Sequence, residues 1–233
     1  MIRRRAFTAG LATALAAPSI SRADAAKPLK FIPQSDLTIL DPVVNTVYTN
    51  RNHGYLVFDT LFGMDSNYQM QPQMVDKYSV EDDGKRWVMT LRDGLMWHDG
   101  EKVLAKDCVA SVKRWARRDG IGSLMMGRVD ELSAIDDKTF QFRLKKPFRQ
   151  LPYALGKIST PMCPMMPERL ALTDPFKAVA EMIGSGPFRF KADEYVSGAR
   201  SVYVKNEKYV PRNEKTTGWT AGGKVVYLDP VSY

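Results

Sequence analysis

Large apolar side chains occupy every second position from residue 87 to residue 91, at Trp87, Met89 and Leu91. A period of two predicts a β-strand with one buried face. The dipeptide Asp83-Gly84 stands just before this run, and glycine accepts the backbone conformation that tight hairpin turns need. The sequence therefore predicts a hairpin whose second strand ends near residue 91.

The hydrophobic period changes after Val103. Apolar side chains then recur on one helical face, at Leu104, Cys108, Val112 and Trp115. Spacings of three and four residues predict an amphipathic helix whose apolar face packs on a core.

Other segments are predicted from the same two periods and from turn signals. Strands are expected at 29–32, 140–144, 188–190, 202–204 and 224–228, and helices at 51–61, 151–155 and 168–172. Two glycines in residues 118–122 predict a flexible break after the first long helix. The chain is therefore expected to have an α+β or mixed α/β fold, without internal repeats.

The first 25 residues have the features of an export signal. A basic start at residues 3–5 precedes an apolar run at 7–17, and Ala23-Asp24-Ala25 is a small-x-small cleavage site. The apolar run is too short to span a membrane. Residues 4–7 partly resemble a twin-arginine signal, and ordinary Sec export is the alternative. Either route places the mature chain in the periplasm.

Charge and cysteine content exclude several classes. The formal net charge is +8, and the leader carries four arginines and one aspartate, which leaves +5 on the mature chain. The remaining basic residues are scattered rather than gathered with stacking aromatics, so we expect no nucleic-acid binding. Two cysteines, Cys108 and Cys163, cannot make a disulfide-rich scaffold, and whether they pair is left open.

No set of catalytic residues is apparent. His53 and His98 are the only histidines, and His98 lies in the turn Trp97-His98-Asp99-Gly100, where it is expected to bond the local backbone. None of the common nucleophile, metalloprotease, phosphate-loop or dinucleotide motifs occurs, so no enzyme activity and no cofactor are predicted. The methionine-rich stretch 162–166 could hold Cu(I), but packing is the preferred interpretation, and no metal site is predicted.

Residues 78–115 resemble the signature of family 5 extracellular solute-binding proteins, the peptide-binding subunits of ABC importers. The shared features are a strand ending in Leu91-Arg92-Asp93-Gly94, an aromatic residue, the His98-Asp99-Gly100 turn and the following helix. Five further elements resemble those of the family and occur in the same order; they lie at 38–42, 58–62, 136–144, 184–188 and 204–209.

This resemblance implies lobe one of a two-lobed, class II periplasmic-binding-protein-like fold. Family members are roughly twice as long as the mature chain, so the chain is expected to be truncated, with the second lobe absent. Segments 26–52 and 183–233 would form the main subdomain, and 53–182 an inserted smaller one. Gly184-Ser185-Gly186-Pro187 would be the return crossing between them.

The resemblance also implies binding residues. The extended segment Asn45, Thr46, Val47 and Tyr48 would bond a peptide backbone, and the loop containing Met125 would reach the ligand. Ordinary packing is the alternative for Tyr48. The acidic residue that pairs with a peptide's amino terminus belongs to lobe two in the family.

The implied function is solute binding for an ABC importer, with peptide as the first ligand class and nickel chelates, opines or sugars as alternatives. The expected partners are the solute and the ABC permease subunits of the inner membrane, with a monomeric binding protein if the chain is complete. Without a second lobe the chain is expected to bind poorly. The alternative is a periplasmic interaction or chaperone-like protein that uses the exposed face of lobe one.

Overall fold

Residues 27–216 and 218–233 are described in the computed structural model of the chain. The predicted export signal at 1–25 lies outside the described residues and stays a prediction. None of the described helices is long and apolar enough to cross a membrane.

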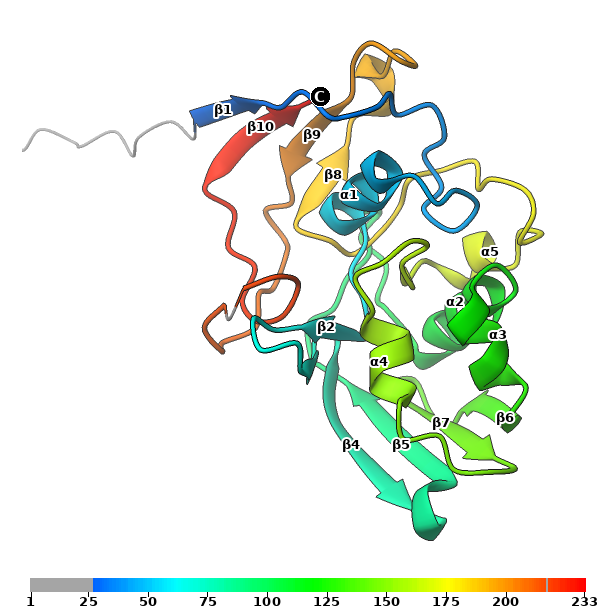
Figure 1. Cartoon of the computed structure of the whole chain (residues 1–233). Helices are drawn as coiled ribbons and strands as arrows, with labels where there is room; N and C mark the ends of the chain where they lie inside the picture. The colour runs from blue at the N-terminus through cyan, green and yellow to red at the C-terminus, as the bar shows by residue number, and fades with distance from the viewer. Residues whose placement is uncertain (1–26, 217) are drawn as a thin grey trace, which may run out of the picture.

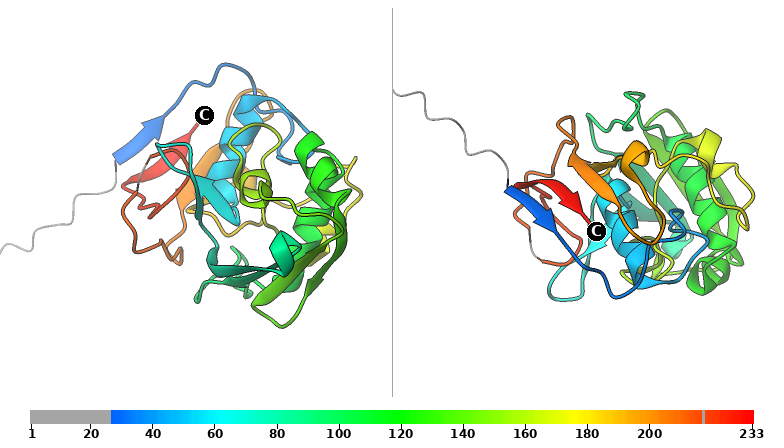
Figure 2. Two further views of the ribbon diagram at one scale, coloured as in Figure 1. Left: turned by 60° about the horizontal axis from the view of Figure 1, so that its bottom comes forward. Right: turned by 90° about the horizontal axis from the view of Figure 1, so that it is seen from above.

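Strands from the two ends of the described chain form one four-stranded sheet (Figure 1). Its spatial order is β1 (Lys27–Lys30), β10 (Leu228–Ser232), β9 (Val202–Lys205) and β8 (Phe188–Phe190). β1 and β10 run parallel and lie side by side in both views of Figure 2, whereas the other pairs are antiparallel. A short 3-10 turn, Ala192–Glu194, separates β8 from β9.

A second four-stranded sheet forms from the middle of the chain and is antiparallel throughout. Its order is β4 (Val75–Glu81), β5 (Arg86–Leu91), β7 (Thr139–Leu144) and β6 (Val129–Ala134). The helices nearby are α2 (Ala105–Ala116), α3 (Gly120–Met126), α4 (Leu151–Gly156) and α5 (Glu168–Ala171), and a small hairpin consists of β2 (Phe62–Met64) and β3 (Met70–Pro72). Because α2 packs on β6 and β7, the main core lies between this sheet and its helices.

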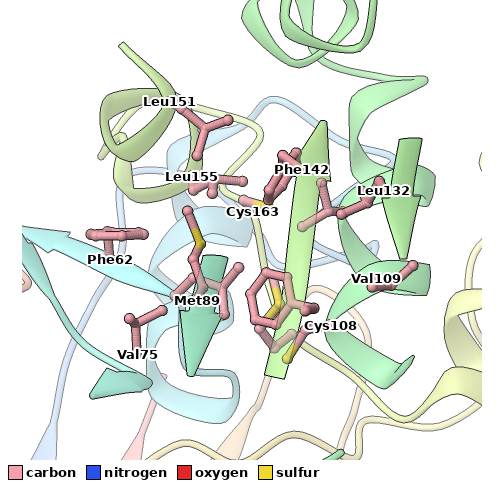
Figure 3. Packing of buried hydrophobic residues seen from close by; sticks show 14 of the residues in the cluster. Phe62, Val75, Met89, Cys108, Val109, Leu132, Phe142, Leu151, Leu155 and Cys163 are labelled. Atoms are coloured by element: carbon pink, nitrogen blue, oxygen red, sulfur yellow. The ribbon is translucent and has the colours of Figure 1, made fainter. Parts of the chain in front are cut away.

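The strand and helix periods predicted this core correctly. Trp87, Met89 and Leu91 of β5 are all buried, and Trp87 and Met89 stand opposite Phe142 and Phe140 of β7. On α2, Cys108, Val112 and Trp115 are fully buried, as their spacing predicts. Figure 3 shows Met89, Phe142, Cys108 and Cys163 within one apolar cluster.

The hairpin signal before β5 is also confirmed. A 3-10 turn, Asp82–Gly84, joins β4 to β5, and Gly84 has a φ of 85°. β4 itself has no hydrophobic signal, because only Val75 of its seven residues is buried.

Residues 118–122 do not form the expected flexible break. Asp119 caps α3 by accepting a hydrogen bond from the Gly122 N–H at 2.9 Å. A Cβ on Gly122 would lie 2.8 Å from the ring of Trp115 and 2.9 Å from the Cα of Ala116. Gly122 is therefore required for the close approach of α3 to α2 rather than for flexibility.

The last strand lies four residues later than predicted. The run 224–228 was expected to form it, but only Leu228 belongs to β10, and Val225 and Tyr227 are exposed. Val231 is buried instead, opposite Tyr203 of β9. Pairing with β1 and β9 decides the position of the strand, and the apolar run before it does not.

The proposed boundary at residue 53 falls inside α1 (Tyr48–Val57). Val57 and Phe58 join the smaller apolar cluster with Phe188 and Tyr203 of the first sheet. α1 therefore packs in part with the sheet formed by the chain ends, and it also contacts Lys157 and Ile158. The division into 26–52 plus 183–233 and 53–182 stays a proposal.

Candidate functional site

The segment expected to bind ligand lies between a buried turn and α1. Asn45, Thr46 and Val47 have no regular structure, and Tyr48 is the first residue of the helix. Thr46 and Val47 are exposed, and the Tyr48 side chain is 55% exposed. The segment is therefore accessible, although Tyr48 is helical rather than extended, and its role in ligand binding stays a prediction.

This segment offers fewer free backbone groups than an extended strand would. The Asn45 Oδ1 accepts a hydrogen bond from the Val47 N–H at 2.9 Å, a local turn that asparagine favours. The Val47 carbonyl accepts from the Arg51 N–H at 3.2 Å as the helix begins. Both backbone groups of Val47 are therefore occupied, so the expected alternating ladder cannot run through this residue.

A buried ion pair holds the turn that precedes the segment. Asp41 and Arg114 approach to 2.7 Å, and their side chains are 0% and 1% exposed. Asp41 also accepts hydrogen bonds from the Val43 N–H and the Val179 N–H, each at 2.9 Å. A buried carboxylate with these partners connects the turn to α2 and to the loop after α5.

A chain of contacts connects the segment to the loop after α4. The Arg118 guanidinium donates to the Val44 carbonyl at 3.2 Å, and the adjacent Asp119 pairs with Lys157 at 2.6 Å. The Arg51 guanidinium donates to the Ile158 carbonyl at 3.1 Å. These contacts join residues 44–48 to Arg51, Arg118 and Ile158. We call the accessible part of this group, with Asp119 and Lys157 buried beneath it, the candidate ligand surface.

Aromatic packing and charge complete the candidate ligand surface. The Cζ of Arg51 lies 4.6 Å from the centre of the Tyr48 ring, and the Cζ of Arg118 lies 4.7 Å from that of Phe176. Lys157 and Asp119 are buried and neutralise each other. Neither Arg51 nor Arg118 forms an ion pair with a carboxylate of the described residues, so this surface carries uncompensated positive charge.

Met125 does not lie on this surface. Its side chain is 0% exposed and packs in the main core, whereas the neighbouring Leu124 is exposed. The expectation that Met125 reaches ligand is therefore wrong for this structure. Because residues 120–126 form a helix, adjacent side chains point in different directions, and assigning them to a loop hid this difference.

The methionine and cysteine cluster has a packing role. Met162, Met165 and Met166 are buried, and Cys108 and Cys163 are both buried free thiols. Burial raises the pKa of the Cys163 thiol well above its usual value. No group of three or more histidine, cysteine, aspartate or glutamate residues is placed to hold a metal in the described part of the chain.

His98 lies in the turn after β5, at residues 97–100. It bonds residues 184–187, the segment expected to be the return crossing, rather than its own turn. Its Nδ1 accepts from the Gly184 N–H at 3.3 Å, and its Nε2 donates to the Gly186 carbonyl at 3.1 Å. Burial lowers the pKa of His98 to about 4, and the hydrogen bond to Gly186 offsets this in part. The expected bond to the local backbone was therefore wrong, because both partners are more than 80 residues away.

We expect protonation of His98 to destabilise the fold. The folded pKa lies below the ordinary value of 6.5, so the unfolded chain binds this proton more readily and stability falls as pH drops from about 6.5 to about 4. Over that pH window, the free energy of unfolding of the native chain should fall by up to about 3 kcal/mol more than that of the His98→Asn variant. Urea unfolding of the native chain and the variant at several pH values measures this difference. Both proteins retain His53. Parallel pH profiles would contradict the prediction.

Comparison with known proteins identifies relatives over nearly the whole chain. Residues 69–233 match the family described as "Bacterial extracellular solute-binding proteins, family 5 Middle". The chain is 44% identical over 234 residues to the "Probable peptide ABC transporter periplasmic-binding protein y4tO" of Sinorhizobium fredii (strain NBRC 101917 / NGR234). This match covers 98% of the chain and 43% of the relative, so the chain spans less than half of that protein's length.

Solved structures share the fold at low sequence identity. The binding protein AgaA from A.tumefacien R10, in complex with agropinic acid, superposes with a TM-score of 0.70 at 22% identity, covering 88% of this chain and 39% of AgaA. The dipeptide-binding protein of Pseudoalteromonas sp. SM9913, in complex with Met-Leu, superposes with a TM-score of 0.69 at 16% identity. The superposition covers 89% of this chain and 43% of the dipeptide-binding protein.

These superpositions confirm the predicted mixed α/β fold of the class II periplasmic-binding-protein type. The family match agrees with the interpretation of a binding protein rather than an enzyme. More than two thirds of the chain matches one family model, and the alignment with a relative of 44% identity covers almost all of the chain. The chain belongs to family 5 of the bacterial extracellular solute-binding proteins.

Proposed function

We propose that this chain supplies one lobe of a periplasmic solute-binding protein that delivers peptides to an ABC permease. The observation that carries the proposal is the 44% identity, over 98% of the chain, to a protein named as a peptide transporter's binding subunit. The peptide would bind at the segment Asn45, Thr46, Val47 and Tyr48, of which the last three residues are exposed.

Several groups on the candidate ligand surface suit a peptide. The Thr46 backbone makes no hydrogen bond with the described residues and can pair with a peptide backbone whatever its side chains are. The Tyr48 ring, backed by Arg51, offers a flat wall for an apolar side chain. A second lobe would close over this surface by hinge motion and exclude water from the ligand.

We expect the chain alone to bind peptides weakly. One wall leaves roughly half of a ligand's surface in water, whereas closed sites bury most of it. Without the charged partner for the peptide's amino terminus, binding loses roughly 2–5 kcal/mol, and each step of about 1.4 kcal/mol is tenfold in affinity. Calorimetry with a mixed tripeptide pool at about 100 µM should therefore give no saturable heat.

A chimera distinguishes the effect of testing one lobe by itself from a wrong ligand class. The chain is fused to the part of the Sinorhizobium relative that it does not match, and the same pool is expected to bind at micromolar concentration. Tight binding by the unfused chain would refute the half-site argument. A folded chimera that binds no peptide, but binds an opine or a nickel chelate, would refute the peptide assignment.

A further inference from the structure

A groove of about 350 Å³ runs along α2. The helix residues that line it extend from Lys106 to Arg117, a distance of about 16 Å at the rise of an α-helix. α5 and the loop after it form one bank, and α5 lies beside α2 in Figure 1. This volume is at the lower end of the range for small-molecule sites, roughly 300–1,000 Å³. No lining residue belongs to the candidate ligand surface, so the groove is a separate place on the molecule.

The middle of the groove is apolar. Val109 and Ala110 of α2 and Ala171 of α5 form its floor, and each is at most 9% exposed. Leu172 stands at the rim, with 72% of its surface exposed. Covering the floor and Leu172 would remove apolar surface from water, which is favourable. The groove therefore favours a ligand with an apolar body.

The two ends of the groove differ in charge. α2 and its C-cap have three exposed side chains, Lys106, Lys113 and Arg117, and all of them are basic. At one end the Lys106 Nζ pairs with a carboxylate oxygen of Glu168 at 3.1 Å. At the other end Lys113 and Arg117 make no ion pair with the described residues, and their spacing of four places their Cβ atoms about 6 Å apart on one helix face. One end is therefore neutralised, and the other stays positive.

We infer that this groove binds a small amphipathic anion, whose charged group lies between Lys113 and Arg117 and whose apolar body covers the floor and Leu172. Two cations one helical turn apart can both bond a single carboxylate, sulfate or phosphate group. The paired end at Lys106 offers no free charge, which sets the direction of the ligand along α2. The inference does not depend on the proposed function, because it concerns another surface of the chain.

Octanoate and octanamide are matched probes, because they share an apolar chain and differ by one charge. Backbone amide NMR signals of Ala110, Lys113 and Ala171 report their binding to the complete chain at concentrations up to about 10 mM. Octanoate is expected to bind about fivefold more tightly than octanamide, since exposed ion pairs contribute modestly. Butanoate keeps the charge but has a shorter chain, and it is expected to bind about tenfold more weakly than octanoate.

Variants of exposed residues separate charge from apolar contact. The double variant Lys113→Gln and Arg117→Gln should lose the preference for octanoate and keep the binding of octanamide. Leu172→Gln should instead weaken both eight-carbon probes equally. The matched control is Lys145→Gln with Lys146→Gln, which removes two neighbouring exposed charges outside the groove and should leave both affinities unchanged. Circular dichroism checks that each variant is folded.

Vesicles of phosphatidylglycerol give the competing outcome. The apolar floor is recessed between α2 and α5, so a free molecule reaches it better than a flat bilayer does, and no co-sedimentation is expected. Co-sedimentation that the double variant abolishes, without a signal shift from octanoate, would assign the groove to a membrane surface and overturn the inference.

Four other results would also overturn the inference. They are no signal shift from octanoate, equal binding of octanoate and octanamide, equal binding of octanoate and butanoate, and a preference for octanoate that survives in the double variant. A preference lost to the same extent in the Lys145→Gln and Lys146→Gln control would show that net charge rather than the groove attracts the anion, and the inference would fail.

Discussion

Replacing Arg114 by methionine is expected to lower the free energy of unfolding by about 3–5 kcal/mol, because it leaves the buried carboxylate of Asp41 without a counter-charge. The two side chains are almost completely inaccessible and meet at 2.7 Å. Arg114 also donates to the carbonyls of Thr173 and Lys177, at 3.1 and 2.8 Å. The substitution therefore loosens the turn before the ligand segment together with the loop after α5. Urea unfolding followed by circular dichroism measures the loss.

Lys138→Met is the control for that change. Lys138 pairs with Asp93, but the two side chains are 56% and 86% exposed, and exposed ion pairs contribute at most about 1 kcal/mol. Both variants remove one positive charge, so a difference between them reports burial rather than net charge. A loss below about 1 kcal/mol in Arg114→Met would mean that water reaches Asp41 in the folded protein.

Replacing Gly184 by alanine is expected to lower the free energy of unfolding by about 3 kcal/mol, which is at the upper end of the usual cost of overpacking. The added Cβ would lie 2.1 Å from the carbonyl oxygen of Val57 and 2.8 Å from its carbonyl carbon. These are backbone atoms at the end of α1, and the Val57 oxygen already accepts from the Gly186 N–H at 2.9 Å. Relief of the clash must therefore separate the return crossing from α1. Thermal or urea unfolding measures the effect.

Gly120→Ala is the matched control for the Gly184→Ala substitution. Gly120 is the first residue of α3, and nothing lies within 4 Å of a Cβ built there. Alanine at that position should be neutral or stabilise the chain by up to about 1 kcal/mol, since it reduces the freedom of the unfolded chain. Equal stability of Gly184→Ala and the native chain would show that the crossing does not pack against α1 as described.

The sequence predicts best those elements whose apolar side chains meet one core. β5, β7 and α2 each bury a regular set of large residues, so their periods of two and 3.6 are visible without the structure. α1 is the counterexample, because its buried residues include Thr49, Asn50 and His53. Apolar spacing therefore placed that helix at 51–61 rather than Tyr48–Val57.

The binding role of Asn45–Tyr48 was predicted from the family motif that precedes them, and it stays a prediction. The structure shows only that Thr46, Val47 and Tyr48 are exposed. The motif could not predict that Asn45 bonds the Val47 N–H, or that Met125 points into the core. Arg51 and Arg118 carry no sequence signal for their carbonyl partners, since Ile158 and Val44 lie in segments far away along the chain.

By itself the sequence determined the periodic elements of the main core and, through the order of its motifs, the family. Only the tertiary structure decided which polar groups are buried and paired, such as Asp41 with Arg114 and His98 with the return crossing. The physical reason is that hydrophobic burial is repeated along an element and leaves a period, whereas an ion pair or a hydrogen bond joins two single residues. Their separation in sequence carries no pattern, and only the packed fold brings them within reach.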